Sequence, residues 1–227
     1  MTKCEKKARL DLVSRRLEEI YPVAPCALEY EGDGWKLLVM GRLSAQCTDA
    51  MVNKVCKILF ERFPTALSLA EAEISEVEKI IKPCGLYHVK AKNIIDSSRR
   101  LVRDFDGRVP STMEELLLFE GVGRKVANLL LGDLYSLPCV VCDTHCIRIC
   151  ARLGMYSQKE KNPDKIEKIL RDLLDVQRGS EFCHRIVLFG RETCTARSPR
   201  CDACPLSDLC EDFIKRSKKT ENGKTQN

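Results

Sequence analysis

Hydrophobic residues recur at intervals of three and four along most of the chain, which is the spacing that places them on one face of an α-helix. Sustained alternation of hydrophobic and polar residues, the pattern of a half-buried strand, is almost absent. The pattern therefore predicts an all-α protein. With 227 residues, 44% of them hydrophobic, the chain can form one large domain or two small ones around a substantial core.

Capping residues and helix breakers indicate where the first predicted helices begin and end. We expect Asp49 to cap a helix that stops before Pro64. A second helix, over residues 77–81, should end at the segment Pro83-Cys84-Gly85, because proline and glycine both interrupt a helix.

The second half of the chain contains further signals for helix starts. Ser111 and Glu114 have the spacing of a capping box and predict a short helix directly after Ser111. Asp143 stands where a cap is expected, and Asn162-Pro163 predicts a helix with proline in its first turn. One more helix is expected over residues 180–190.

The charge balance is mildly basic. Lys and Arg outnumber Asp and Glu by 38 to 33, which gives a net charge of +5. An excess of this size is compatible with nucleic-acid binding but does not establish it. Basic residues are concentrated in the last stretch of the chain, and we expect residues 214–227 to form a basic, disordered tail.

No apolar run approaches the ~20 residues that a membrane span requires, so we expect no membrane partner. The N-terminal segment is basic but leads into a charged amphipathic stretch, unlike a signal peptide. Fourteen cysteines without a secretion signal indicate a reducing compartment. We therefore expect a cytoplasmic protein, or a nuclear one in a eukaryote.

Four cysteines lie close together near the C-terminus, in the pattern Cys194-x6-Cys201-x2-Cys204-x5-Cys210. Short turn-forming links join them, and the segment is polar, so it offers little core in which four thiols could pack. Four such thiolates can converge on one metal centre. The spacing alone leaves two alternatives, a tetrahedral zinc site and a cubane iron–sulfur cluster.

A second cysteine group, at Cys139, Cys142, Cys146 and Cys150, also has spacings typical of metal ligands. However, Cys146 and Cys150 are four residues apart, and so fall on one face of a predicted helix where small core residues belong. We interpret this upstream group as thiols of the core.

The segment Phe119-Glu120-Gly121-Val122-Gly123-Arg124-Lys125 joins two predicted helices. Its two glycines let the backbone turn tightly and bring N–H groups close to a ligand. Those donors, together with the positive end of the next helix dipole, favour a phosphate. The segment therefore predicts a helix-hairpin-helix that binds the DNA backbone, although a plain turn between two helices has a similar pattern.

Lys125 and Asp143 are the candidate catalytic residues. A lysine with a pKa near ~10.4 is almost fully protonated at neutral pH and is a poor nucleophile. Near a helix N-terminus and beside Arg124, a second positive charge is disfavoured, and partial burial would disfavour it further. Asp143 is stabilised in its ionised form as a helix cap. Together the two residues would supply an attacking amine and a fixed negative charge.

Taken together, these motifs resemble the endonuclease III branch of the helix-hairpin-helix DNA glycosylases, over about residues 10–213. Besides the hairpin and the C-terminal cysteines, the resemblance rests on Leu43-Ser44-Ala45-Gln46 followed by Thr48-Asp49, Gly85-Leu86-Tyr87 followed by Lys90-Ala91, and Asp143-Thr144-His145.

The resemblance implies a fold of two all-α lobes with the active cleft between them. A helical-barrel lobe would span residues 27–137 and contain the helix-hairpin-helix at about 111–131. Residues 1–26 and 138–213 would form an iron–sulfur lobe. The resemblance also implies a [4Fe–4S] cluster, held by Cys194, Cys201, Cys204 and Cys210, in place of zinc.

The implied activity is that of a bifunctional DNA glycosylase and AP lyase of base excision repair. Such an enzyme removes oxidised pyrimidines from duplex DNA through a lysine Schiff base and nicks the 3′ side by β-elimination. The resemblance implies that Lys125 attacks the sugar C1′, that Asp143 assists, and that Gln46 and Leu86 fill the gap left by the extruded nucleotide. The partner would be duplex DNA with a damaged base or an abasic site, bound by a monomer. The residues implied to contact DNA are Gln46, Leu86, Gly121, Val122, Gly123, Arg124, His145, Arg197 and Arg200.

Three positions depart from the family pattern. Glu120 stands where proline usually enters the hairpin, Arg42 replaces a residue that is usually apolar, and Cys84 replaces a larger aliphatic residue. Two alternative functions are a monofunctional glycosylase of the same fold and a non-enzymatic module that binds DNA structures. Lys125 argues against the first, and Lys125 with Asp143 argues against the second.

Overall fold

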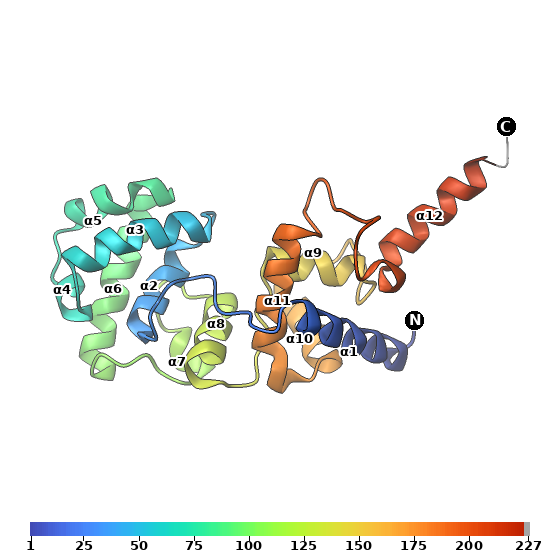
Figure 1. Cartoon of the computed structure of the whole chain (residues 1–227). Helices are drawn as coiled ribbons and strands as arrows, with labels where there is room; N and C mark the ends of the chain where they lie inside the picture. The colour runs from blue at the N-terminus through green and yellow to red at the C-terminus, as the bar shows by residue number, and fades with distance from the viewer. Residues whose placement is uncertain (225–227) are drawn as a thin grey trace. The chain divides into compact units, whose positions relative to one another are not determined.

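The computed structural model describes residues 1–224, with side chains through residue 218, and the regular elements of this part of the chain are helices (Figure 1). The prediction of an all-α fold is therefore confirmed. The chain divides into two compact units. One is Cys26–Leu137; the other combines Met1–Pro25 with the chain from Pro138 onward. One division, at 25/26, lies one residue from the boundary expected at 26/27, and the other is at the expected position, 137/138.

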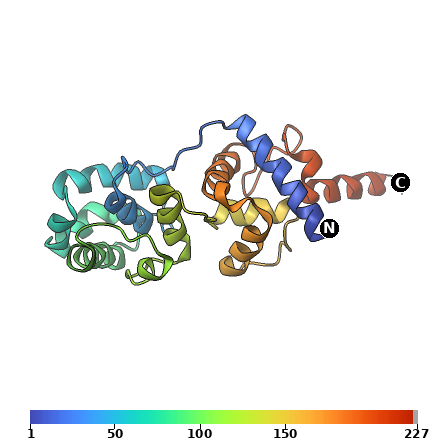
Figure 2. The ribbon, with the colours of Figure 1, turned by 90° about the horizontal axis from the view of Figure 1, so that it is seen from below.

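The unit Cys26–Leu137 is built around α2 (Gly34–Leu43). Most residues of α2 are buried, because the helix is hydrophobic on all sides and packs against α3, α6 and α8 (Figure 2). The indole of Trp35 on α2 donates a hydrogen bond of 3.0 Å to the hydroxyl of Ser98 on α6. The other elements of this unit are α3 (Asp49–Arg62), α4 (Ala66–Ala70), α5 (Ile74–Ile81), the 3₁₀ turn η1 (Lys82–Cys84), α6 (Tyr87–Phe105), α7 (Met113–Leu116) and α8 (Arg124–Tyr135).

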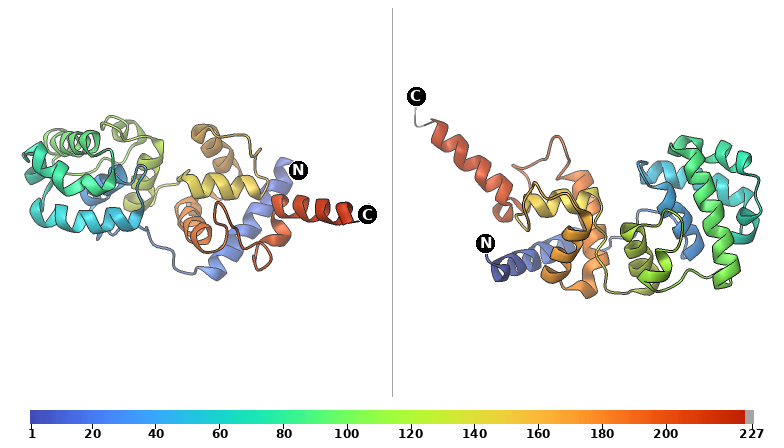
Figure 3. Two further views of the ribbon diagram at one scale, coloured as in Figure 1. Left: turned by 90° about the horizontal axis from the view of Figure 1, so that it is seen from above. Right: turned by 180° about the vertical axis from the view of Figure 1, so that it is seen from behind.

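The second unit joins the N-terminal helix to the C-terminal part of the chain. Helix α1 (Lys3–Ile20) buries Leu10, Val13 and Leu17, which lie on one face at helical spacing, against α10 and α11 (Figure 3). Helix α11 in turn packs on α9. The elements from Pro138 onward are α9 (Thr144–Arg152), α10 (Pro163–Leu173), η2 (Val176–Arg178), α11 (Gly179–Glu192), η3 (Ser207–Leu209) and α12 (Glu211–Lys224).

Two of the predicted helix caps are wrong by one residue. The cap of α3 is Thr48, whose hydroxyl accepts from the backbone N–H of Met51 at 3.3 Å, and Asp49 is the first helical residue. The cap of α7 is Thr112 in place of Ser111, with its hydroxyl accepting from the N–H of Glu115. The caps of α9 and α10, at Asp143 and Asn162, are confirmed.

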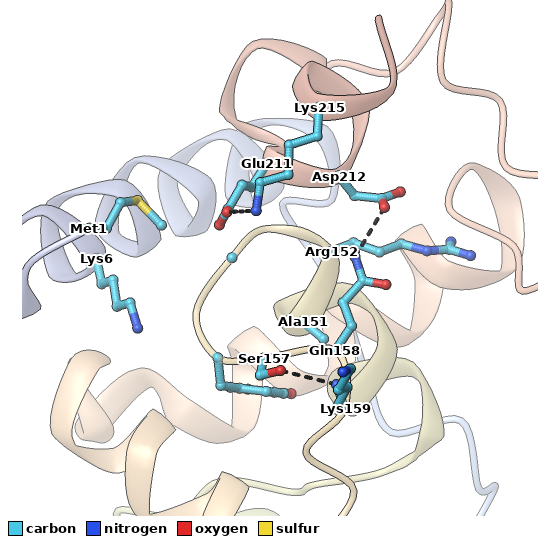
Figure 4. A pocket seen from close by; sticks show the side chains of 12 residues that line it. Met1, Lys6, Ala151, Arg152, Ser157, Gln158, Lys159, Glu211, Asp212 and Lys215 are labelled. Atoms are coloured by element: carbon cyan, nitrogen blue, oxygen red, sulfur yellow. Dashed lines mark hydrogen bonds and ion pairs between the residues drawn. The ribbon is translucent and has the colours of Figure 1, made fainter. Parts of the chain in front are cut away.

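The expectation of a disordered tail from residue 214 is wrong for the described residues, because α12 continues to Lys224. Ion pairs at i,i+4 spacing explain this: Glu211 pairs with Lys215, and Asp212 pairs with Arg216 at 2.9 Å. Asp212 also accepts a hydrogen bond of 3.0 Å from Gln158, which ties the first turn of α12 to the segment after α9 (Figure 4). Residues 225–227 lie outside the described part. None of the described helices combines the length and apolar character that a membrane crossing needs.

Candidate functional site

The four C-terminal cysteines follow α11 and line a single cavity. Cys194 comes directly after the end of α11, where its N–H donates to the carbonyl of Phe189 at 2.9 Å. Cys201 and Cys204 lie in the loop that follows, and Cys210 immediately precedes α12. All four line a cavity whose other walls include Arg152, Phe213 and Arg216. The structure therefore brings together the thiols that the spacing in the sequence predicted.

Positive side chains surround these sulfurs. Arg152 of α9 donates to Cys194 Sγ at 3.2 Å, and Arg216 of α12 donates to Cys201 Sγ at 3.3 Å. Guanidinium groups of this kind are the outer hydrogen-bond donors that orient metal-bound sulfur ligands.

The spacing of the four sulfurs distinguishes between the two metal centres that the sequence left open. Four thiolates on one zinc ion lie about 3.8 Å apart, because each Zn–S bond is about 2.3 Å and the geometry is tetrahedral. Among the described residues, no three of the sulfurs of Cys194, Cys201, Cys204 and Cys210 lie within 4.8 Å of one another. A cubane cluster places each thiolate on a different iron and so holds the sulfurs farther apart. The residues present therefore fit a cluster better than a single ion.

The upstream cysteine group behaves as core. Cys139, Cys142, Cys146 and Cys150 are all buried, as expected of packed thiols. Hydrogen bonds with Cys142, Cys150 and Cys183, together with burial, raise the pKa of the Cys146 thiol well above its ordinary value. The four cysteines of this group are therefore packed thiols of the core.

The helix-hairpin-helix consists of α7, the loop through Gly123, and α8. Gly121 has φ +70°, a left-handed conformation that favours glycine, and Gly123 is the N-cap of α8. Val122 is buried and fixes the loop, while both glycines are exposed. No side chain caps the first turn of α8, so its N–H groups are available to an anion.

Lys125 is the second residue of α8. The opposite face of that helix, with Ala127 and Leu130, is fully buried, and α8 packs on α2. The Lys125 side chain is exposed. The partial burial that was considered from the sequence is therefore not observed. Lys125 is exposed at the N-terminus of α8, next in sequence to Arg124.

Asp143 is half-buried as the N-cap of α9, and its Oδ1 accepts from the N–H of Cys146 at 2.7 Å. One turn later, Arg148 lies 3.1 Å from the Nδ1 of the half-buried His145 and donates to the carbonyl of Cys194 at 2.9 Å. Burial lowers the pKa of Arg148. The start of α9 is thus connected directly to the first cysteine of the C-terminal group.

Gln46 and Leu86, the expected gap-filling residues, share an unusual backbone. Both are exposed and both have positive φ, 54° and 48°. Non-glycine residues in this region are uncommon and are held there by their surroundings. The surroundings include Lys90, which is buried and whose ammonium donates to the carbonyls of Leu43, Ala45 and Cys84. This contact was not predicted from the sequence, where its signal is a lysine on the buried face of α6.

The remaining predicted DNA contacts fall in two places. Arg197 and Arg200 are exposed in the loop between Cys194 and Cys201. Arg124 is half-buried in the first turn of α8, beside the hairpin.

Comparison with known proteins assigns this arrangement to a family. Residues 39–175 match the HhH-GPD superfamily of base excision DNA repair proteins, and residues 194–210 match the iron–sulfur binding domain of endonuclease III. The chain belongs to the endonuclease III family. The second match confirms the prediction of a [4Fe–4S] cluster in place of zinc.

Individual relatives support this family assignment over nearly the whole chain. The chain is 42% identical to endonuclease III of Synechocystis, over 90% of this chain and 93% of the relative. It is 36% identical to that of Escherichia coli K12, over 91% and 96%. A solved non-covalent endonuclease III–DNA complex has a TM-score of 0.88 at 35% identity, covering 96% of this chain and 99% of the other. A trapped covalent endonuclease III–DNA intermediate gives a TM-score of 0.87 at 35% identity, with the same coverage.

This endonuclease III homologue is therefore a DNA glycosylase with AP-lyase activity that acts in base excision repair, and its partner is DNA. A thermostable thymine-DNA glycosylase shares the fold at 20% identity with a TM-score of 0.83, over 95% of this chain and all of the other, which shows the fold alone.

Proposed function

We propose that this endonuclease III homologue removes oxidised pyrimidines from duplex DNA and that Lys125 is its nucleophile. The observation that carries the proposal is the position of Lys125: it is exposed in the first turn of α8, next to uncapped N–H groups that suit a DNA phosphate. An amine held there lies next to the bound backbone.

The proposed reaction needs no group beyond the chain and its substrate. The Lys125 nitrogen attacks C1′ of the extruded nucleotide, and the damaged base leaves with the bonding electrons and takes up a proton. Asp143, whose side chain caps α9, stabilises the positive charge that develops on the sugar. One proton of the ammonium now bound to C1′ moves to O4′ as the C1′–O4′ bond breaks, and this gives a protonated Schiff base. The Schiff base acidifies the C2′ proton. Loss of that proton breaks the C3′–O bond and nicks the strand on its 3′ side.

We further propose the groups that hold DNA. The hairpin of Gly121, Val122 and Gly123, with Arg124, would bind one phosphate through backbone N–H groups and charge. Arg197 and Arg200 would bind a second stretch of backbone, and His145 would contact DNA from the first turn of α9. Gln46 and Leu86 would occupy the space left by the extruded nucleotide, which offsets part of the few kcal/mol of lost stacking. We expect the protein to do this as a monomer.

Cys194, Cys201, Cys204 and Cys210 are the proposed ligands of the [4Fe–4S] cluster. The cluster supplies no step of the chemistry. Its ligands fix both ends of the loop that carries Arg197 and Arg200, so that the two cations lie on an ordered backbone.

Borohydride trapping tests the proposed function. The holoprotein, incubated with a duplex carrying one oxidised pyrimidine and then with borohydride, should form a covalent protein–DNA adduct that resists denaturation. Lys125→Gln should abolish the adduct and the nick together while duplex binding is retained. Lys79→Gln, which changes an exposed lysine of α5 in the same unit, is the matched control and should trap normally. Trapping at the wild-type level in Lys125→Gln would refute the assignment.

A further inference from the structure

Arg42 and Glu120, which carry opposite charges, both lie at the hairpin. Arg42 lies near the end of α2, far from the hairpin in sequence. Its guanidinium nevertheless lies against the hairpin backbone, since a β-carbon added at Gly121 would lie 1.9 Å from Arg42 Nη2. Gly121 is therefore required for two reasons: its positive φ and the space that Arg42 occupies.

The guanidinium of Arg42 is incompletely satisfied. Its Nε is buried and, among the described residues, has no hydrogen-bond partner. Burial lowers the pKa of Arg42, and the negative charge of Glu120 opposes this effect. Glu120 is exposed, so much of its attraction is screened by solvent. A half-buried cation with an unused donor is costly unless an anion arrives to pair with it.

We propose that Arg42 is an additional phosphate ligand of this hairpin, with Glu120 as the counter-charge that holds the guanidinium in place before DNA binds. The proposal rests on the proposed role of the hairpin in binding DNA. The phosphate oxygens would accept hydrogen bonds from N–H groups of α8 on one side. On another side they would accept hydrogen bonds from the planar guanidinium of Arg42. Arg42 and Glu120 then act as a pair. Glu120 alone would repel a phosphate. Arg42 alone would leave a poorly compensated positive charge beside a buried helix.

A simpler role for Arg42 would be to neutralise Glu120 without touching DNA. The two roles predict different salt dependence. A direct phosphate contact releases one counterion, so its loss lowers the slope of log K against log salt concentration by about 0.9. Neutralisation of Glu120 predicts no remaining effect of Arg42 once Glu120 is uncharged. A double-mutant cycle therefore separates them.

The experiment measures binding of the full-length holoprotein to an undamaged duplex at several salt concentrations. Arg42→Met keeps an unbranched apolar stem, and Glu120→Gln keeps the shape of the carboxylate. Arg42→Met should weaken binding about tenfold at low salt and lower the slope by about 0.9, both in the otherwise wild-type protein and in combination with Glu120→Gln. Glu120→Gln alone should tighten binding. Arg108→Met, an exposed arginine elsewhere in the unit, is the control and should leave the slope unchanged.

Three results would overturn the proposal. One is a wild-type slope in Arg42→Met. Another is an effect of Arg42→Met that disappears when Glu120→Gln is also present. The third is a loss of folding in Arg42→Met, measured by thermal unfolding, with an unchanged slope in Arg42→Lys. Gly123→Val tests the proposed role of the hairpin separately from the role of Arg42. A β-carbon at position 123 meets no atom within 4 Å, so the fold should be kept, but it obstructs the approach of a phosphate. If Gly123→Val weakens binding and Arg42→Met does not, only the role of Arg42 is wrong.

Discussion

The ammonium of Lys90 donates a hydrogen bond of 2.8 Å to the carbonyl oxygen of Cys84. The same nitrogen donates to the carbonyl of Ala45 at 2.7 Å, so one charge ties two loops that are far apart in sequence. Gln46 follows Ala45 directly, and Leu86 follows Cys84 by two residues. Both have left-handed backbone conformations. Lys90 therefore holds the two proposed gap-filling residues in conformations that neither would favour alone.

Replacing Lys90 with Met should destabilise the protein and disorder both loops. The substitution keeps the length of the side chain but leaves three carbonyl oxygens without their donor. Unsatisfied buried acceptors cost about 1–3 kcal/mol each, and partial relaxation reduces the sum, so we expect a loss of about 3–5 kcal/mol in the free energy of unfolding. Denaturant titration measures this loss. A change below about 1 kcal/mol would show that both loops keep their conformations without Lys90.

The effect of Lys90 on function is best measured with Leu86 as a reference. If Lys90 acts by positioning the loops, Lys90→Arg should retain most of the stability while weakening binding to a duplex with an abasic site. Binding to undamaged duplex should change little, because no gap needs filling there. Leu86→Ala should give the same selective loss without loss of stability, since Leu86 is 58% exposed.

Replacing Arg216 with Gln should weaken retention of the iron–sulfur cluster. Loss of an outer hydrogen-bond partner of a metal ligand typically costs about 10- to 100-fold in metal affinity, and Arg216 donates to Cys201 Sγ. We therefore expect the visible absorbance of the cluster to decay at least several-fold faster in the presence of an iron chelator. Lys218→Gln, an exposed change on the same helix, is the control. Equal rates in the two variants would mean that α12 does not protect the cluster.

The role of α12 could not be predicted from its composition. Its lysine-rich sequence is typical of a frayed end, yet Asp212 pairs both with Arg216 in the next turn and with Gln158 of another segment. The second contact depends on the fold. The role of Lys90 could not be predicted for the same reason. Its three acceptors come from two segments that are distant from each other in sequence.

Helical periodicity and helix caps can be predicted more accurately from the sequence than such long-range contacts. Helical periodicity predicts the class of fold, and the caps at Asp143 and Asn162 are predicted correctly. Asp143 and Thr144 stand side by side, and the structure uses the first of the two. At the starts of α3 and α7, two capping residues stand side by side, and the structure uses Thr48 and Thr112. Which of two adjacent caps is used depends on where the backbone turns, and that depends on packing across the unit.

Replacing Arg197 with Ala should weaken binding to damaged and undamaged duplexes alike. Arg197 is exposed in the loop between the first two cysteines, where it can reach phosphates but carries no information about the base. We expect the slope of log K against log salt concentration to fall by about 0.9, one phosphate contact. Arg15→Ala, an exposed arginine of α1, should leave it unchanged. A variant that lost only its preference for damaged DNA would contradict this assignment.

Replacing Asp143 with Asn separates two roles that the carboxylate could have. Asparagine caps helices as well as aspartate does, so its carbonyl oxygen should keep the hydrogen bond from the N–H of Cys146, and α9 should fold normally. What is lost is the charge. Base excision from a duplex with an oxidised pyrimidine should therefore slow by at least about a hundredfold under single-turnover conditions, because the developing positive charge on the sugar loses its stabilisation. Cleavage of a preformed abasic site should slow much less, since no glycosidic bond remains and the amine can attack the open aldehyde directly. Equal losses on the two substrates would instead show that Asp143 acts mainly by positioning or deprotonating Lys125.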